Sequence, residues 1–404
     1  MTAIRAFAAR VLAMVLLVGL GGLGWPAPAQ AAEFHVGTAA ELAAALGTAQ
    51  TNGEDDIIVL APGTYVGNFS YTLGDGKALT LRGAEGTRPE EVVLDGGGSG
   101  TVLTLYPSAA GGTVRLEDLT VQRGGQRGLR VEGSGSIHVI LSRVVVQDNR
   151  TDTHGGGIRV YTWANGAVTM DIRDSVIRRN EAANRGGGIH AHAYAGNSTV
   201  DLLIVNTLIY GNRAGWSSGG VQVSASEVGE NNVARAVVVH STITGNTCGI
   251  TSPWEKGGGL WVYAYQGTGA RASLDLYNTI LYGNFARGGE EVQDLYIGER
   301  SPGEAVANAY FSDVGMVTLG TGLPTYTATS VISADPAFAD AAAGDYHLTA
   351  VSPCRDTGTE AVPDPPGLPA YDFEGQPRVM GPAPDIGVDE FGMVRYLPLA
   401  LKGR

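Results

Sequence analysis

The sequence predicts an all-β solenoid, a fold in which successive coils of short strands stack on one another. Three observations favour it. Strand-like apolar runs are bounded by Gly or Asn, no helical period lies between these runs, and one motif recurs along the middle of the chain. Two or three such runs per repeat exclude a sheet built from alternating strands and helices.

The composition supports the same class. Glycine accounts for 60 of the 404 residues, 40 acids outnumber 27 bases, and apolar residues make up 44% of the chain. These values exclude a coiled coil, a helical bundle and a basic nucleic-acid-binding protein, and they provide for a sizeable core. Cys248 and Cys354 permit one disulfide at most, so disulfides do not hold this fold together.

Residues 1–31 have the layout of a secretory signal peptide. Arg5 and Arg10 precede an apolar stretch, and Ala29-Gln-Ala31 forms a cleavage site. We therefore expect a secreted protein that is extracellular or associated with the cell surface. No later stretch approaches the roughly 20 apolar residues that a membrane helix needs, so no span is expected after cleavage.

A short helix is expected next. Thr38-Ala-Ala-Glu41 is a capping box, and Leu42, Ala45 and Leu46 share one face of the helix that it starts. Such a helix would cover the open end of a solenoid. Strand-like segments follow at residues 56–60, 79–83 and 93–96.

The repeated motif defines the coil. An apolar run ends three residues before an Asn, and a polar turn, glycines and an alternating strand follow. The asparagines are spaced 31, 32, 34 and 38 residues apart, and the last copy is degenerate: Asn149, Asn180, Asn212, Asn246 and Asn284. Insertions confined to the turn are typical of stacked solenoids. We expect the asparagines to form a ladder of side-chain amides, with glycines at the tight corners.

With the capping helix and the segments after it, these repeats resemble the right-handed parallel β-helix proteins of the pectate-lyase-like superfamily. The resemblance covers roughly residues 33–300 and implies a right-handed parallel β-helix solenoid with an N-terminal helical cap over residues 32–300. It implies little about function, because one fold hosts many activities.

Residues 301–404 are expected to form an irregular C-terminal region. Ala334-Asp-Pro-Ala-Phe338 and Asp385-Ile-Gly-Val-Asp-Glu390 resemble the choice-of-anchor Q region that often ends secreted bacterial β-helix proteins, and the tail at 396–404 looks like a surface-retention signal. The acids of this region raise the question of calcium. The ligand spacing of an EF-hand loop is absent, however, so turn and capping roles are favoured and no cofactor is expected.

Strand alternation assigns one face of the solenoid to solvent. Coils stack about 4.8 Å apart, so the outward side chains should form one flat ribbon along the long axis. Gln222 and Ser224 lie within this ribbon, and an earlier coil adds Arg130 and Glu132. The ribbon is rich in aromatic rings, His and Arg, and nine of its residues are the candidate binding site: Arg159, Tyr161, Trp163, His190, His192, Tyr194, Trp261, Tyr263 and Tyr265.

This face favours glycan binding. Aromatic rings suit sugar rings, and Arg and His hydrogen-bond to hydroxyls or carboxylates. The leading hypothesis is a monomer that binds a polysaccharide or a cell-surface glycan without catalysis. A structural surface spacer is a further alternative.

The enzymatic alternative is a polysaccharide lyase or glycoside hydrolase acting on an acidic glycan. In a lyase, His190, His192 or Tyr161 could act as the base, and Arg159 could stabilise the negative charge that develops on the substrate. The acids that either enzyme needs are scarce, because Glu132 alone lies on the ribbon and Asp171 and Asp174 belong to another strand and its turn. We therefore assign no catalytic residue.

A metal at His190-Ala-His192 is the remaining question. Two His one residue apart have metal-compatible spacing, yet the sequence offers no obvious third ligand. We expect no metal there.

Overall fold

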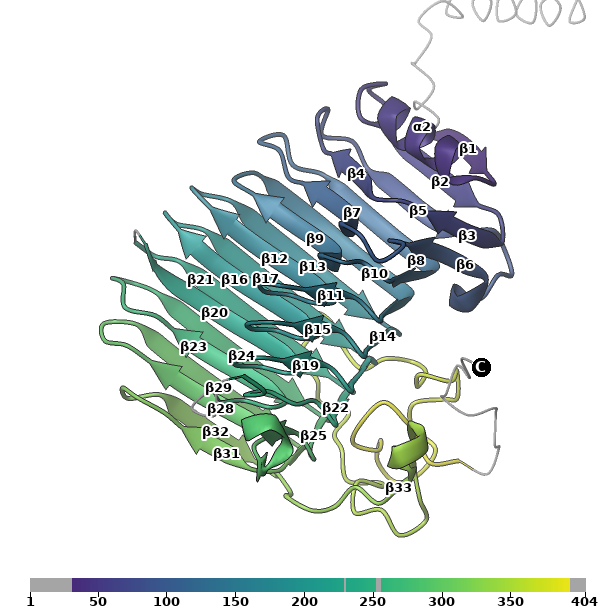
Figure 1. The fold of residues 1–404 in the computed structure, drawn as a ribbon. Coiled ribbons are helices and arrows are strands. Elements are labelled where there is room, and N and C mark those ends of the chain that lie inside the picture. The colour runs from purple at the N-terminus through teal and green to yellow at the C-terminus, as the bar shows by residue number, and fades with distance from the viewer. Residues whose placement is uncertain (1–30, 229, 252–255, 393–404) are drawn as a thin grey trace, which may run out of the picture.

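The computed structural model describes residues 31–228, 230–251 and 256–392 and shows an all-β parallel β-helix (Figure 1). Almost all of the predicted signal peptide (residues 1–31) and the whole 396–404 tail lie outside the described residues. Within the described residues, no helix has the length and apolar character that a membrane crossing requires.

The solenoid begins with the predicted cap. Helix α2 (Ala39–Ala49) starts at Thr38, whose side chain accepts a hydrogen bond from the Glu41 backbone N–H while the Glu41 carboxylate accepts one from the Thr38 N–H. This is the capping box that the sequence predicts. The buried face of α2 carries Leu42, Ala45, Leu46 and Ala49, and the helix lies at the first coil (Figure 1).

Two large sheets form the walls of the coils, and every strand pair in them is parallel. The nine-stranded sheet consists of β4 (Phe69–Thr72), β7 (Thr101–Tyr106), β9 (Arg127–Gly133), β12 (Ile158–Trp163), β16 (Ile189–Ala195), β20 (Val221–Val228), β23 (Leu260–Ala264), β28 (Leu295–Glu299) and β31 (Val317–Leu319).

The eighteen-stranded sheet forms the other walls. It contains β1 (Ala32–Val36), β2 (Asp56–Leu60), β3 (Gly63–Val66), β5 (Leu79–Gly83), β6 (Val92–Asp95), β8 (Thr113–Gln122), β10 (Ser136–Gln147), β13 (Ala167–Arg173), β14 (Val176–Arg178), β17 (Thr199–Val205), β18 (Leu208–Tyr210), β21 (Val233–Val239), β22 (Thr242–Thr244), β24 (Arg271–Tyr277), β25 (Ile280–Leu281), β29 (Glu304–Tyr310), β30 (Asp313–Val314) and β32 (Thr325–Thr329).

Short elements complete the coils. They are the parallel trio β11 (Arg150–Thr151), β15 (Glu181–Ala182) and β19 (Arg213–Ala214), the antiparallel pairs β26 (Phe285–Ala286) with β27 (Glu291–Val292) and β33 (Phe338–Asp340) with β34 (Asp345–Leu348), and 3-10 turns at Pro89–Glu91, Arg287–Gly289 and Ala341–Ala343.

The core runs inside the coils as rows of aliphatic side chains. Val160, Ala191, Val223 and Val262 are in register on four successive strands, and all four are fully buried. Successive side chains of a strand point to opposite faces of the sheet. Because this row points into the core, the residues directly before and after it on each strand point to the outer face of the nine-stranded sheet.

The predicted asparagine ladder is present. Nδ2 of each Asn donates to Oδ1 of the next at 2.9–3.0 Å, from Asn149 through Asn180, Asn212 and Asn246 to Asn284. Asn284 Nδ2 donates in turn to the Asp294 carboxylate at 2.9 Å, which ends the ladder. The five asparagines are buried, so the ladder satisfies polar groups in the interior of the turn.

Parallel pairing continues past residue 300, where the sequence analysis ended the solenoid. Strand β29 pairs with β24, and β32 pairs with β29, so the last strand of the wall ends at Thr329. The final coil lacks the Asn and Gly pattern that marks the earlier ones, and for that reason the motif does not reveal it.

Residues 333–392, here called the C-terminal cover, fold back beside the solenoid near β22 and β25 (Figure 1). Arg378 is buried, and its guanidinium donates to the Asn206 side chain and to the carbonyls of Gly387 and Val388. Leu348, Cys354 and Ile386 pack on Ile280 of β25. Cys354 and Cys248 are both buried, and no disulfide joins them.

Candidate functional site

The nine predicted residues lie on strands β12, β16 and β23 or directly after them, all on the nine-stranded sheet. Strand β20 stands between β16 and β23 and contributes Gln222 and Ser224. The register is regular over the first five paired residues of the four strands and gives two outward rows: Arg159–His190–Gln222–Trp261 and Tyr161–His192–Ser224–Tyr263. It shifts after them, at Trp163 of β12 and between Ala193 and Ala195 of β16. The alternation argument therefore placed these side chains on one face correctly.

The face is not the flat ribbon that alternation predicted. Trp261 and Tyr263 are only 5% and 7% exposed, because they stack on each other with centroids 4.7 Å apart and Tyr265 packs against both. The aromatic rings of the predicted set that reach solvent are those of Tyr161, Trp163, Tyr194 and Tyr265. Trp261 and Tyr263 thus support the site instead of forming its surface.

A pocket of about 260 Å³ opens where β20 crosses the face. The Gln and Ser side chains of β20 are shorter than the rings on either side, and the difference in length creates the hollow. Its lining residues are His154, Arg159, Tyr161, Arg185, His190, His192, Tyr194, Gln222, Ser226 and Tyr265. Six of these belong to the predicted set, and Trp163, Trp261 and Tyr263 lie outside the lining.

Rings form the wall of the pocket on the β12 and β16 side. Tyr161 stacks on His192 at 5.6 Å and on Tyr194 at 5.2 Å between centroids. The Arg159 guanidinium lies 4.5 Å from the centroid of the Tyr161 ring, a cation–π contact. Tyr194 is 36% exposed and is the most open ring at the pocket rim.

Arg185 forms the opposite wall. It belongs to the turn before β16, and its Nη1 donates to the Tyr265 hydroxyl at 2.8 Å. Its guanidinium also faces the rings of Trp216, Trp261 and Tyr265 at 5.4, 5.5 and 5.9 Å. The bond to Tyr265 spans 80 residues of sequence and joins two coils across the hollow.

The pocket histidines are neutral at pH 7. Burial, with the nearby charges of Arg159 and Arg185, lowers the pKa of His154 to about 4. Burial likewise lowers the pKa of His192 to about 3 and that of His190 well below its usual value. The positive charge of the pocket at neutral pH therefore belongs to its arginines.

Two polar side chains on the pocket floor are incompletely bonded. Gln222 Nε2 donates to Ser224 Oγ at 2.8 Å, and the same oxygen lies 2.6 Å from His192 Nδ1. Gln222 Oε1 and His190 Nδ1 have no hydrogen-bond partner among the described residues, although these residues are only 1% and 4% exposed. Buried polar atoms normally find partners, so these two atoms are available to water or to a bound molecule.

Sequence reasoning missed Arg185 and His154, because alternation describes strands and these residues occupy turns. A signal was nevertheless present. His154, Arg185 and Lys256 each stand immediately before a Gly-Gly-Gly run, in the first, second and fourth copies of the motif, whereas Ser217 holds this position in the third copy.

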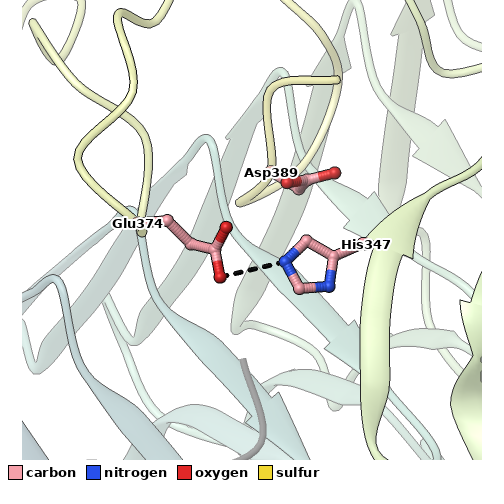
Figure 2. Close-up of side chains that lie close together, drawn as sticks. All are labelled: His347, Glu374 and Asp389. Carbon is pink, nitrogen blue, oxygen red and sulfur yellow. Dashed lines mark ion pairs between the residues drawn. The ribbon is translucent and has the colours of Figure 1, made fainter. Parts of the chain in front are cut away.

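The C-terminal cover holds a separate polar cluster, drawn in Figure 2. His347 Nε2 lies 3.0 Å from the Glu374 carboxylate, and its Nδ1 lies 2.5 Å from Asp345. Asp389 accepts a hydrogen bond from the Leu348 N–H at 2.8 Å. The ligand atoms of His347, Glu374 and Asp389 lie within 4.8 Å of one another, a spacing compatible with a metal ion.

The protonation of His347 favours a different role for this cluster. Burial opposes the charged imidazole, but the hydrogen bonds to Glu374 and Asp345 outweigh it and raise the pKa of His347 to about 9. A carboxylate faces each ring nitrogen, so the imidazolium itself is the cation that joins these segments of the cover. The sequence favours turn and capping roles over calcium for the acids of this region, and it gives no sign that His347 lies beside Glu374 and Asp389.

Comparisons with known proteins do not identify a family for this chain. No protein-family model and no curated protein matches the chain. Among solved structures, the A-module of the mannuronan C-5 epimerase AlgE6 from Azotobacter vinelandii is similar to this chain at 15% sequence identity. The match covers 74% of this chain and 95% of that one, with a TM-score of 0.20, and it carries no functional argument.

Proposed function

We propose that this protein is secreted or retained at the cell surface, where it binds a glycan through the pocket on the nine-stranded sheet without catalysis. One observation carries the proposal: rings, arginines and unpaired buried polar atoms converge on one hollow between β12 and β23. Sugar rings pack on aromatic side chains, and their hydroxyls both donate and accept hydrogen bonds. The export part of the proposal rests on residues 1–31 alone.

Binding fits this chemistry better than proton transfer does. A lyase working near neutral pH needs a base whose pKa lies near that pH. Burial raises the pKa of Tyr161 to about 12 and lowers that of His192 to about 3, so the tyrosine holds its proton and the imidazole is a weak base. A hydrolase needs two carboxyl groups across the bond, and none of the described residues that line the pocket carries one.

The test is retention of the purified protein in gels containing acidic or neutral polysaccharide. Tyr194→Ala removes the most exposed ring of the rim and should weaken retention on the recognised polysaccharide by about tenfold, the effect of roughly 1.4 kcal/mol. Tyr277→Ala is the matched control, because Tyr277 stacks on Tyr310 at 4.8 Å on the eighteen-stranded sheet, away from the pocket.

Three outcomes separate the alternatives. Retention that Tyr194→Ala weakens and Tyr277→Ala leaves unchanged supports the pocket. Formation of unsaturated or reducing sugar ends during the assay would show that the protein is a lyase or a hydrolase. Absence of retention across a broad panel would contradict glycan binding and leave the role of a structural spacer.

A further inference from the structure

Positive charge around the pocket exceeds the negative charge that the described residues supply there. The positive charges of four arginines act on the groups in and around the pocket: Arg127, Arg130, Arg159 and Arg185. Among the described residues, Glu132 is the one carboxylate that forms an ion pair with any of them. Glu132 lies 2.7 Å from Arg130 and 3.6 Å from Arg159. Its single negative charge is thus shared by two arginines, which leaves one positive charge of this group without a counter-ion.

The other two arginines, Arg127 and Arg185, have no carboxylate partner among the described residues. Arg127 donates to the Thr153 hydroxyl and the His154 carbonyl, and burial lowers its pKa to about 10. Arg185 is held by the Tyr265 hydroxyl and the aromatic rings, and no described carboxylate lies within ion-pair distance of it. A guanidinium fixed at the wall of a pocket without a counter-ion is suited to an anionic group of a ligand.

The floor of the pocket adds a second requirement. Gln222 uses its amide nitrogen on Ser224, so its free Oε1 needs a donor from the ligand. Carboxylates and sulfates accept hydrogen bonds only, whereas a sugar hydroxyl donates. The arginine wall and the glutamine floor are therefore satisfied together by a sugar that carries both an anionic group and a hydroxyl. A volume of about 260 Å³ lies below the usual range for drug-sized ligands and suits one sugar unit.

We infer that the pocket is a subsite for one anionic sugar unit of a glycan, with its carboxylate or sulfate at Arg159 and Arg185 and a hydroxyl at Gln222. This inference rests on the proposed function and adds the ligand class. The rings of Tyr161 and Tyr194 flank the sugar at the β12 side, and neighbouring units continue over the face along the solenoid.

The experiment is calorimetric titration of the protein with trigalacturonate and with its methyl ester, which has the same rings without the charge. Dextran sulfate and dextran form a second pair that distinguishes sulfate from carboxylate. The wild-type protein should bind the acidic member of at least one pair about tenfold or more tightly than the neutral member.

Arg185→Gln should abolish most of that preference, and Arg185→Lys should keep part of it because the charge remains. Arg235→Gln is the matched control, since Arg235 lies on β21 of the other sheet and pairs with Asp201 at 3.0 Å. Thermal unfolding of each variant checks that Arg185 substitution leaves the fold intact despite the lost bond to Tyr265.

The failures are distinguishable. Equal binding of the charged and neutral members in both pairs would overturn the anionic subsite and leave glycan binding standing. A preference for the charged member that Arg185→Gln does not reduce would place the anion elsewhere and also overturn the inference. Binding of no probe, together with no gel retention on any polysaccharide, would overturn the proposed function itself.

Discussion

At the scale of single residues, the same repeat produces the ladder inside the turn and the pocket outside the sheet. Asn212 shows how much one ladder residue does. Its Nδ2 donates to Asn246 and to the Ile177 carbonyl, and its Oδ1 accepts from both the N–H and the Nδ2 of Asn180. All of these groups are buried, where a missing partner costs more than an ordinary hydrogen bond contributes.

Asn212→Ala should therefore lower the free energy of unfolding by about 2–4 kcal/mol. Asn308→Ala is the matched control, because Asn308 makes one bond, to Asp275, on the half-exposed outer face of β29. That variant should lose less than about 1 kcal/mol. Chemical denaturation measures both. Equal losses in the two variants would show that the ladder is not an important source of stability.

The side of the sheet on which a site residue lies can be predicted from the sequence, whereas its burial and its contacts cannot. Strand alternation is a property of the backbone, so the sides of Arg159, His190 and Trp261 could be assigned from the sequence. The burial of a side chain depends on how its neighbours turn and on what the next coil places beside it. Trp261 and Tyr263 lie two residues apart on β23 and stack on each other, and Tyr296 of β28 stacks on Trp261. Alternation gives the side of a residue but not these contacts. Arg185 enters from a turn of variable length, and its bond to Tyr265 joins residues far apart in the sequence.

At the scale of elements, the C-terminal cover is held to the solenoid by buried polar groups. Arg378 bonds to Asn206, the Asn278 side chain bonds to both backbone groups of Thr359, and Val388 N–H donates to Thr242. The short acidic motifs of this region indicated turns but not these partners. Each partner lies on another coil, and the sequence carries no periodicity that relates the cover to the coils.

The cover should lose stability as the pH rises through the pKa of His347. Its folded pKa of about 9 lies above the ordinary value of 6.5, so the stabilisation is complete below pH 6.5 and disappears as the pH rises through 9. The groups facing it are Asp345, Glu374 and Asp389, and all are carboxylates. After allowance for solvent screening, we expect a loss of about 1–2 kcal/mol.

His347→Gln removes the titrating group and should flatten this dependence. Thermal unfolding and limited proteolysis of the cover between pH 7 and about 9.5 compare it with the wild-type protein. We expect the variant to be the less stable of the two at pH 7 and the two proteins to converge at the alkaline end. Parallel curves for the two proteins across this range would show that His347 is not the cation that joins the cover.

At the scale of the whole molecule, a basic pocket lies on an acidic protein. The formal net charge of the chain is −13, while the pocket is lined by arginines and neutral histidines. The overall charge repels an anionic polymer at long range, and the pocket attracts its anionic groups at short range. Binding should therefore select ligands that can place a charged unit in the pocket.

The central claim is that this pocket on the nine-stranded sheet receives the sugar. A crystal structure of the protein with the tightest-binding acidic oligosaccharide from the titrations tests it most directly. We predict one sugar unit in the hollow over β20, with its anionic group within hydrogen-bond distance of Arg159 or Arg185 and a hydroxyl on Gln222. An oligosaccharide ordered on the eighteen-stranded sheet or on the C-terminal cover, with the pocket free of sugar, would contradict the claim.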